Sequence, residues 1–293
     1  MKSDLSRRTA LKNIVAGTAA LGVSAAIPAF AFEAHTTTML KGNINHSVCR
    51  WCFGNMTLDE LCIEAKKIGI KAIDLVGPKD WPTLKKHGLH SSLCNGAEIN
   101  LVDGWNDPKF HATLIKNYSE MIPKVAEAGY TQLICFSGNR RGKDDETGLA
   151  NCVEGLKQVL PLAEKHGVVL VMELLNSKVD HKDYQCDHTA WGVELAKRLG
   201  SENFKLLYDI YHMQIDEGNV ISNIKTYNQY ISHYHTAGVP GRNEIDSTQE
   251  LNYPAIMKAI VATGFKGFVA QEFMPKYADK LKSLRDAVNI CDV

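Results

Sequence analysis

Residues 204–242 read FKLLYDIYHMQIDEGNVISNIKTYNQYISHYHTAGVPGR, and this stretch decides the fold. It contains two apolar runs of strand length, FKLLYDI and YISHYH, with a helical segment between them. The first run carries Asp209 near its end and is followed by His212, and the second run ends on His235. Carboxylates and imidazoles are common metal ligands, so each run brings a candidate ligand to its carboxyl end.

Two further runs repeat this arrangement, one upstream and one downstream. GVVLVMELLN carries Glu173, and KGFVAQEF carries Glu272. Four successive strand-like runs therefore each deliver one carboxylate or imidazole at their carboxyl end. In a closed parallel barrel the carboxyl ends of all strands lie on one face, so side chains about 100 positions apart can meet there.

Eight apolar runs alternate with amphipathic helical segments along the chain. In order, the runs are SVCRW, KAIDLVG, LHSSLC, TQLICF, VVLVMEL, FKLLYDI, ISHYH and GFVAQEF. Apolar strands separated by helices indicate a parallel sheet with helices outside it. Eight such units favour an α/β fold of the (β/α)8 TIM barrel type over an open sheet, and residues 46–293 match its usual length of about 250 residues.

Local signals predict several helix boundaries. Thr57 is the expected N-cap of a helix that ends at Gly69. Pro161 predicts a kink or an early start in the helix of LANCVEGLKQVLPLAEKHG. We expect Asp187 to open the next helix, and we expect the helix after the sixth strand to run over about residues 220–230.

The charge balance argues against a nucleic-acid partner. The chain has 33 Lys and Arg against 33 Asp and Glu, which gives a formal net charge of zero. Such a chain has no electrostatic basis for binding nucleic acid or an acidic membrane surface. A homo-oligomer is compatible with the sequence, which does not decide the oligomeric state.

The N-terminus has the pattern of an export signal. Arg7 and Arg8 precede a mild Ala/Gly-rich apolar run over residues 14–27, which is too short to span a bilayer. The triplet AFA at Ala29–Ala31 then offers a small-residue cleavage site. This order of a charged segment, an apolar run and a cleavage site predicts that residues 1–31 are a signal peptide.

The same segment resembles a twin-arginine translocation signal, with Ala10 at the place where Phe is usual. An ordinary secretion signal or an uncleaved anchor is the alternative. We expect the twin-arginine export machinery to be a partner, cleavage to leave Phe32 first, and residues 32–45 to form a tether. The expected location is the periplasm or another exported compartment.

The eight cysteines all follow the predicted signal. An oxidising compartment permits disulfides, but several cysteines lie within apolar runs, as Cys94 and Cys135 do, which is typical of buried free thiols. Cys49 and Cys52 have the C-x-x-C spacing of a redox or zinc half-site. Because no second such pair exists, we favour a structural role for these two residues.

The four strand-end residues form a candidate metal site. Three carboxylates and one imidazole make an oxygen-rich set, which suits Mg²⁺ or Mn²⁺ best, with Co²⁺, Fe²⁺ or Zn²⁺ possible. One acid alone would more often be a helix cap or a salt bridge at the barrel rim. Four at successive strand ends favour a divalent metal on the active-site face.

From about residue 46 to residue 291 the chain resembles the xylose isomerase-like barrel superfamily, and within it most closely the hydroxypyruvate isomerases. The carrying motifs are HSVCRWCFGNMTLDELC, GWNDPKF, CFSGNR, MELLNS, YDIYHMQ, HYHTAGVPGRNEID and QEF. The resemblance implies that Glu173 and Glu272 are catalytic glutamates that also bind the metal. It implies that Asp209 and His235 are the other two metal ligands. Related ketose 3-epimerases share these four positions.

The chain differs from the cytosolic members of this family in one respect, and from a related branch in another. Cytosolic members lack an export signal, so the resemblance is a better guide to chemistry than to substrate. The resemblance to a related branch, endonuclease IV with three zinc ions, would require extra His ligands after the early strands and an Asp-x-His after the seventh strand. Residues 244–248 read EIDST and offer none, which together with the zero net charge argues against DNA repair.

The expected reaction interconverts a small hydroxy-keto acid and its aldehyde isomer, of the hydroxypyruvate and tartronate semialdehyde type. The metal binds the carbonyl and hydroxyl oxygens and acidifies the C–H between them. One glutamate takes the proton and the other returns one, through an enediolate. A ketose 3-epimerase or keto-sugar lyase on the same site is the alternative enzyme. An exported sugar-binding protein is the alternative that is not an enzyme.

We expect four further residues to bind the substrate: His212, Asn176, Arg140 and Arg242. Arg242 follows a Gly- and Pro-shaped loop after the seventh strand, and Arg140 follows the fourth strand on the same face. A guanidinium there can bind a carboxylate through two parallel hydrogen bonds. The alternatives are solvated loop charges for the arginines and a satisfied loop histidine for His212.

Overall fold

Eight parallel strands form the centre of the protein in the computed structural model, which describes residues 39–293. Neighbouring strands follow the order β3-β2-β1-β8-β7-β6-β5-β4, and every pair is parallel. The strands are β1 (Asn45–Cys49), β2 (Ala72–Asp74), β3 (His90–Ser91), β4 (Gln132–Cys135), β5 (Val169–Glu173), β6 (Phe204–Asp209), β7 (Ile231–Thr236) and β8 (Phe268–Gln271).

The sheet closes on itself between β3 and β4 through a single residue. Cys94 forms one parallel bridge to Val76 and another to Leu133 of β4. The backbone N–H of Cys94 donates to the carbonyl of Gln132 at 2.9 Å, and its carbonyl accepts from the N–H of Ile134 at 2.9 Å. This closure confirms the predicted (β/α)8 barrel and gathers the carboxyl ends of the strands on one face.

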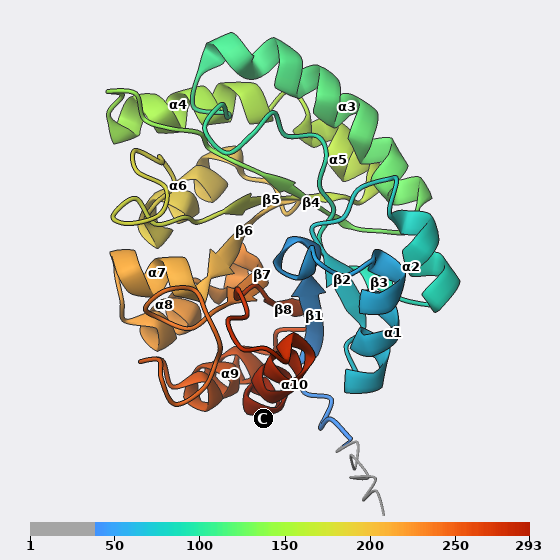
Figure 1. The fold of residues 1–293 in the computed structure, drawn as a ribbon. Helices are drawn as coiled ribbons and strands as arrows, with labels where there is room; N and C mark the ends of the chain where they lie inside the picture. The colour runs from blue at the N-terminus through green and yellow to red at the C-terminus, as the bar shows by residue number, and fades with distance from the viewer. Residues whose placement is uncertain (1–38) are drawn as a thin grey trace, which may run out of the picture. The chain divides into compact units, whose positions relative to one another are not determined.

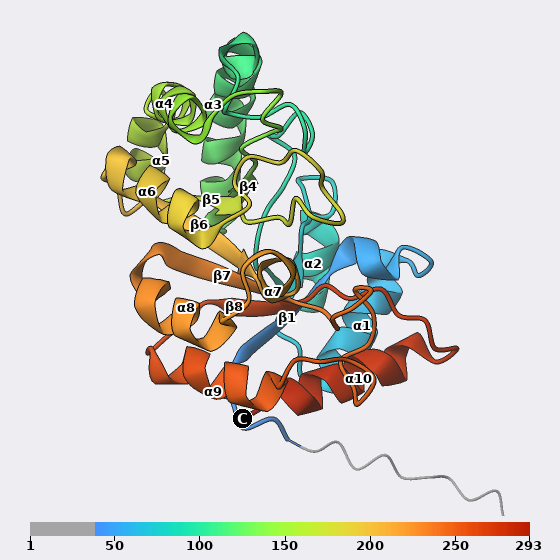
Figure 2. The same ribbon diagram turned by 90° about the vertical axis from the view of Figure 1, so that its left-hand side faces the viewer.

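Helices cover the outside of the strands, as Figures 1 and 2 show in two perpendicular views. They are α1 (Leu58–Ile68), α2 (Trp81–His87), α3 (His111–Glu127), α4 (Asp145–Leu156), α5 (Leu160–His166), α6 (Thr189–Leu199), α7 (Ile210–Asp216), α8 (Val220–Tyr227), α9 (Tyr253–Ala262) and α10 (Lys280–Cys291). Three short 3₁₀ turns are η1 (Arg50–Phe53), η2 (Pro108–Phe110) and η3 (Asn228–Tyr230).

The local signals of α1 and α5 act as predicted. The hydroxyl of Thr57 accepts from the N–H of Glu60, and the Glu60 carboxylate accepts from the N–H of Thr57, so two otherwise unpaired helix N–H groups are satisfied. Gly69 ends α1 with φ 96°, a left-handed conformation that favours glycine. Pro161 produces a full break, because α4 ends at Leu156 and α5 begins with Pro161 in its first turn.

One boundary prediction is wrong, and one helix was not predicted. Asp187 does not open a helix, because α6 begins two residues later and the Asp187 carboxylate instead accepts from Ser177 and Arg140 at 2.7 and 3.0 Å. The helix expected at about residues 220–230 is confirmed as α8 and η3, but a further helix, α7, starts directly after β6. It begins there because the carboxylate of Asp209 caps its first N–H groups.

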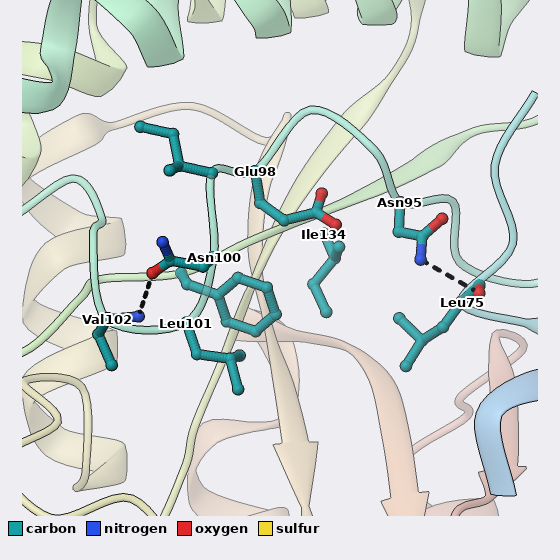
Figure 3. A pocket seen from close by; sticks show the side chains of 9 residues that line it. Leu75, Asn95, Glu98, Asn100, Leu101, Val102 and Ile134 are labelled. Carbon is teal, nitrogen blue, oxygen red and sulfur yellow. Dashed lines mark hydrogen bonds between the residues drawn. The ribbon is translucent and has the colours of Figure 1, made fainter.

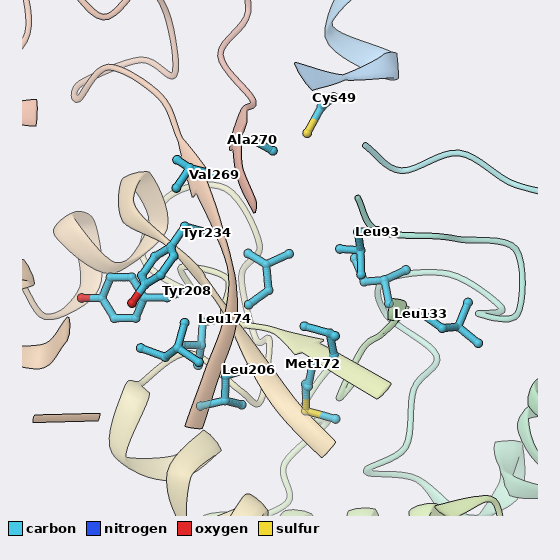
Figure 4. Packing of buried hydrophobic residues seen from close by; sticks show 14 of the residues in the cluster. Cys49, Leu93, Leu133, Met172, Leu174, Leu206, Tyr208, Tyr234, Val269 and Ala270 are labelled. Atoms are coloured by element: carbon cyan, nitrogen blue, oxygen red, sulfur yellow. The ribbon is translucent and has the colours of Figure 1, made fainter. Parts of the chain in front are cut away.

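An apolar layer between strands and helices holds the barrel rigid. Figure 4 shows part of it, including Leu206 and Tyr208 of β6 and Tyr234 of β7. Gly192 lets α6 approach β6 closely, since a Cβ there would lie 2.9 Å from a methyl carbon of Leu206. Full burial of one such side chain stabilises the fold by about 1.5–3 kcal/mol, so this layer fixes the strand ends in place.

All eight cysteines lie in the described part of the chain, and each is buried and free. This agrees with the expectation of structural thiols, Cys49 and Cys52 included. No helix within residues 39–293 is long and apolar enough to cross a membrane. The predicted signal peptide lies outside the described residues.

Candidate active site

The four predicted ligands meet at the carboxyl ends of the strands. Glu173 ends β5, Asp209 ends β6, His235 lies near the end of β7 and Glu272 directly follows β8. Each offers one ligand atom, and these atoms all lie within 4.8 Å of one another. The side chains are buried, with residue exposures of 4% or less. The four residues come from four strands that are successive neighbours in the sheet, so its curvature gathers their side chains at one end of the barrel.

The two carboxylate oxygens of Asp209 have different contacts, one with the start of α7 and one with the site. Its Oδ1 accepts from the N–H groups of Tyr211 and His212 at 2.8 and 3.2 Å, which starts α7. Its Oδ2 lies 3.7 Å from His212 Nε2 and 3.8 Å from a guanidinium nitrogen of Arg242. One oxygen is therefore fixed by backbone while the other faces the cluster.

Asp74 sets the orientation of the His235 ring. Its Oδ2 lies 2.7 Å from His235 Nε2, so Nε2 carries the proton and donates it. His235 Nδ1 then points to the acids, 3.2 Å from Glu173 Oε1 and 2.9 Å from Glu272 Oε2. No hydrogen bond of normal geometry joins Nδ1 to either oxygen. Burial opposes protonation of His235, but Glu272 and Asp74 raise its pKa well above 6.5, so the ring is charged in the protein alone. When the ring is neutral, its Nδ1 lone pair and the two carboxylates converge in the arrangement of a carboxylate–histidine–metal triad.

Changing Asp74 to Asn should lower divalent metal affinity by about 10- to 100-fold, because the ring loses the acceptor that fixes its tautomer. Titration calorimetry with Mn²⁺ measures this without any substrate. Ser92→Ala is the matched control, since the Ser92 hydroxyl donates to the other oxygen of Asp74 and contacts no ligand in the described residues. Equal Mn²⁺ affinity in Asp74→Asn and wild type would show that Asp74 does not orient the ring.

The charge of the cluster fits a divalent cation. Three buried carboxylates face one buried guanidinium, that of Arg242, which leaves two uncompensated negative charges when His235 is neutral. Buried charges require partners, and Glu173 Oε1 has no hydrogen-bond partner in the described residues. An oxygen-rich donor set with one imidazole suits Mg²⁺ or Mn²⁺.

The pKa shifts reflect the same crowding of like charges. Burial, with the neighbouring charge of Glu272, raises the pKa of Asp209 to about 8, and burial raises the pKa of Glu173. Burial alone would raise the pKa of Glu272 too, but the charges of His235 and Arg242 hold it well below its ordinary range. In the protein alone, one carboxylate is thus kept ionised while its two neighbours resist ionisation.

Arg242 lies over the cluster, as predicted from its loop. Its guanidinium is 2.5 Å from Glu272 Oε2, and its carbon lies 5.2 Å from the centre of the Trp51 ring and 5.6 Å from that of Tyr211. Only 14% of its side chain is exposed. Two aromatic faces and an acid therefore hold this charge at the mouth of the site.

Asn176 and His212 form a pair beside the cluster. The Asn176 carbonyl oxygen accepts from the N–H groups of Val179 and Asp180, so its amide nitrogen faces His212 Nδ1 and donates to it at 2.6 Å. The proton of His212 then sits on Nε2, which is buried and has no hydrogen-bond partner in the described residues. Burial, aided by the charge of Arg242, keeps the pKa of His212 well below 6.5, so the ring is neutral.

Arg140 is held by other groups. It pairs with Asp145, lies 3.0 Å from Asp187 and donates to the carbonyl of Gln185 at 3.2 Å. These three acceptors come from the loops around α4 and α6, and no contact of Arg140 with the four ligands occurs in the described residues. Its predicted role in substrate binding has no support from this arrangement and stays a prediction.

Two residues of the site escaped the sequence analysis. Trp51 donates from its indole N–H to Glu272 Oε1 at 2.9 Å, and Asp74 orients His235 as described above. Asp74 ends β2 just as Asp209 ends β6, so the strand-end rule could have found it. Trp51 lies in the turn after β1, and its large exposed ring carries no such signal.

Comparisons with known proteins agree with the fold and the family. A family described as "Xylose isomerase-like TIM barrel" matches residues 64–289. Hydroxypyruvate isomerase of Escherichia coli is 30% identical over 224 residues, 73% of this chain and 86% of that protein. 2-oxo-tetronate isomerase of Cupriavidus necator is 33% identical over 127 residues, 43% of this chain and 48% of that protein. The chain likewise spans less than half the length of its human relative, 45%.

Among solved structures, one titled AP endonuclease, family 2, from Brucella melitensis superposes with a TM-score of 0.74. It is 23% identical, and the match covers 82% of this chain and 97% of that one, which is a likeness of fold. The prediction of an isomerase is supported by the names of the two bacterial relatives. By its closed parallel barrel and by the match over residues 64–289, the chain belongs to the xylose isomerase-like TIM barrel family.

Proposed function

We propose that the protein is a metal-dependent isomerase acting on a small hydroxy-keto acid of the hydroxypyruvate type. The observation that carries the proposal is the buried cluster of three carboxylates and one imidazole beneath a single arginine. Two of the carboxylates, Glu173 and Glu272, reach the same nitrogen of His235. The relatives named hydroxypyruvate isomerase and 2-oxo-tetronate isomerase support the same class of reaction.

Glu173, Asp209, His235 and Glu272 would hold the metal, which when bound polarises the substrate carbonyl and acidifies the neighbouring C–H. The two glutamates exchange protons with the substrate. One removes the proton from the carbon that bears the hydroxyl, and the other delivers a proton to the former carbonyl carbon, so the acid and its aldehyde isomer interconvert through an enediolate.

His212 and Arg242 orient the substrate in this proposal. The neutral His212 ring has a buried Nε2–H without a partner in the described residues, which can donate to a substrate oxygen. Arg242 carries the only guanidinium that contacts the cluster in the described residues, and it can pair with the substrate carboxylate. Asn176 keeps His212 in the tautomer that donates.

Metal content tests the proposal most directly. Purified wild type should carry about one equivalent of divalent metal by elemental analysis, and Asp209→Ala or His235→Ala should lose it because each removes a contact to the ion. Glu217→Gln is the control, since Glu217 bonds Thr189 and Asn223 instead. Wild-type protein without divalent metal, with activity that survives chelation, would exclude the metal-dependent reaction.

We also propose that the protein is exported through the twin-arginine route, on the grounds of Arg7, Arg8 and the Ala29–Ala31 triplet. The exported form should begin at Phe32, which N-terminal sequencing of the periplasmic fraction measures. A variant with both arginines changed to lysine should stay in the cytoplasm. An unchanged distribution of that variant would mean that export does not use this signal.

A further inference from the structure

A cavity of about 460 Å³ lies beside the carboxyl ends of β2 and β4 and has no part in the chemistry described so far. Most of its walls are apolar side chains, namely Leu75, Ile99, Leu101, Val102, Ile134 and Phe136. Figure 3 shows Ile134 between the segment of residues 98–102 and the pair formed by Leu75 and Asn95.

The side chains of β4 place this cavity in the mouth of the barrel. Gln132 donates from its amide to the carbonyl of Ser232 in β7, a strand that is not its neighbour, so its side chain crosses the barrel interior. Side chains two and four residues further along a strand point the same way, which turns Ile134 and Phe136 inward as well.

The strand register puts this wall next to the acids. Cys135 pairs with Met172 between β4 and β5, so the residues that follow each of them, Phe136 and Glu173, leave the strands side by side. On the other flank, Leu75 directly follows Asp74, the residue that orients His235. The ligands therefore come from β5 to β8, and the apolar cavity occupies the part of the mouth over β2 to β4.

Each polar side chain of the cavity already makes at least one hydrogen bond to nearby backbone. The Glu98 carboxylate accepts from the N–H groups of Gly96 and Ala97 at 2.8 and 3.0 Å. The Asn95 amide donates to the carbonyl of Leu75 at 3.2 Å, and Asn100 bonds to Asp103 and the N–H of Val102. A hydroxyl-rich ligand would lose its bonds to water here and find few replacements, whereas an apolar ligand loses nothing.

Leu75 is held in a strained conformation at the edge of this cavity. Its φ is 54°, in the left-handed region that a leucine rarely adopts. Its backbone is fixed from both sides, since its N–H donates to the carbonyl of Leu93 at 2.9 Å and its carbonyl accepts from Asn95. Strain of this kind, maintained by surrounding bonds, tends to occur at binding sites.

We propose that this cavity binds an apolar substituent of the substrate, so that the substrate is a hydroxy-keto acid longer than three carbons with a non-polar tail. The inference rests on the proposed function for the head group and adds the class of the tail. A three-carbon acid fills only a small part of the space, because cavities of about 300–1,000 Å³ hold much larger ligands.

Binding of two simple 2-oxo acids tests the cavity without relying on turnover. Pyruvate and 2-oxohexanoate carry the same head and differ in three methylene groups, and neither has the hydroxyl that isomerisation needs. Titration calorimetry on the protein with Mn²⁺ should give at least tenfold tighter binding of 2-oxohexanoate, since each buried methylene contributes about fourfold. A 2-oxo acid of the same length with a hydroxylated tail should not share this advantage.

Variants of the cavity wall make the test specific. Leu101→Asn should remove the advantage of 2-oxohexanoate and leave pyruvate binding within about twofold, and Ile99→Asn repeats the test in case the first variant folds poorly. Ile63→Asn is the matched control, because Ile63 is a half-exposed residue of α1 that does not line this cavity. It should retain the full advantage.

The possible outcomes distinguish a failure of the proposed tail site from a failure of the proposed isomerase activity. Equal binding of the two acids, no binding of either, or an advantage that survives both wall variants overturns the proposed tail site. Turnover of hydroxypyruvate by wild type is measured in parallel. Absence of turnover of both hydroxypyruvate and a longer hydroxy-keto acid with an apolar tail counts against the isomerase itself, while the binding comparison still decides whether the cavity takes an apolar chain.

Discussion

Replacing either Glu173 or Glu272 by Gln should lower turnover of the hydroxy-keto acid by about 10² to 10⁴-fold, the scale of a general acid or base. The amide keeps the size and one oxygen of the carboxylate, so the fold and most substrate binding should persist. The loss should fall on kcat, because proton transfer occurs in the reaction step and not in binding.

Two measurements check this result. Wild type working in deuterated water should place deuterium on the carbon next to the carbonyl, and each Glu→Gln variant should slow that exchange as much as it slows turnover. Glu217→Gln, which alters a carboxylate bonded to Thr189, should do neither. Turnover with complete retention of the substrate hydrogen would point to a hydride shift and remove the proton-transfer role of the two glutamates.

The two glutamate variants should differ in stability. Glu272 accepts from Trp51 and pairs with Arg242, so its change to an amide removes a buried ion pair and leaves the guanidinium with only the more distant Asp209, at 3.8 Å. Glu173 has an oxygen with no hydrogen-bond partner in the described residues and loses less. Thermal unfolding of the two metal-free variants reports this difference apart from catalysis.

Replacing Arg242 by Ala should weaken the reaction of the acid substrate by about 2–5 kcal/mol in kcat/KM, the scale for truncating one side of a buried charge pair. The reason is its position: it carries the only positive side chain that contacts the cluster in the described residues, and it is clamped over Glu272 by Trp51 and Tyr211. Neutral ketoses have no carboxylate that Arg242 could bind, so any residual activity on them should change little in Arg242→Ala.

Arg140→Ala is the comparison that makes this test sharp. Both arginines follow barrel strands on the same face, but Arg140 is tied to Asp145 and Asp187. If Arg140 binds the substrate as predicted from the sequence, Arg140→Ala should also lower kcat/KM for hydroxypyruvate; a change of less than about threefold would leave it only its pairs with Asp145 and Asp187. A preference of wild type for a neutral hexulose, or equal losses on both substrate classes in Arg242→Ala, would favour the ketose epimerase instead.

The positions of the ligands were predictable because one rule governs them. A parallel barrel puts every strand end on one face, and Asp209, His235 and their two partners all stand at strand ends. The start of α7 was not predictable in the same way. The sequence predicts Asp209 as a metal ligand, and only the structure shows that one of its oxygens also caps a helix.

Contacts between distant loops set the remaining limits of sequence analysis. Arg140 and Arg242 look alike as loop arginines, and what distinguishes them is which acids the fold brings to each. Asp74 and Trp51 act through residues more than 150 positions away, on His235 and Glu272. No local pattern encodes such pairs, because they depend on how all eight strands close.

The closure of the sheet at Cys94, called the seam below, has a consequence for the dynamics of the barrel. β3 is only two residues long, and one residue with two backbone hydrogen bonds to β4 completes the ring there, whereas β6 and β7 share a longer ladder. Local opening of a folded protein begins where the fewest bonds must break, so amide hydrogen exchange should enter the barrel at this seam. Cys94 is followed directly by Asn95 of the apolar cavity wall, while the candidate metal ligands lie on or directly after the strands with longer ladders. The proposed tail site thus lies beside the junction of the sheet with the fewest backbone hydrogen bonds, whereas the candidate ligands lie on strands with longer ladders.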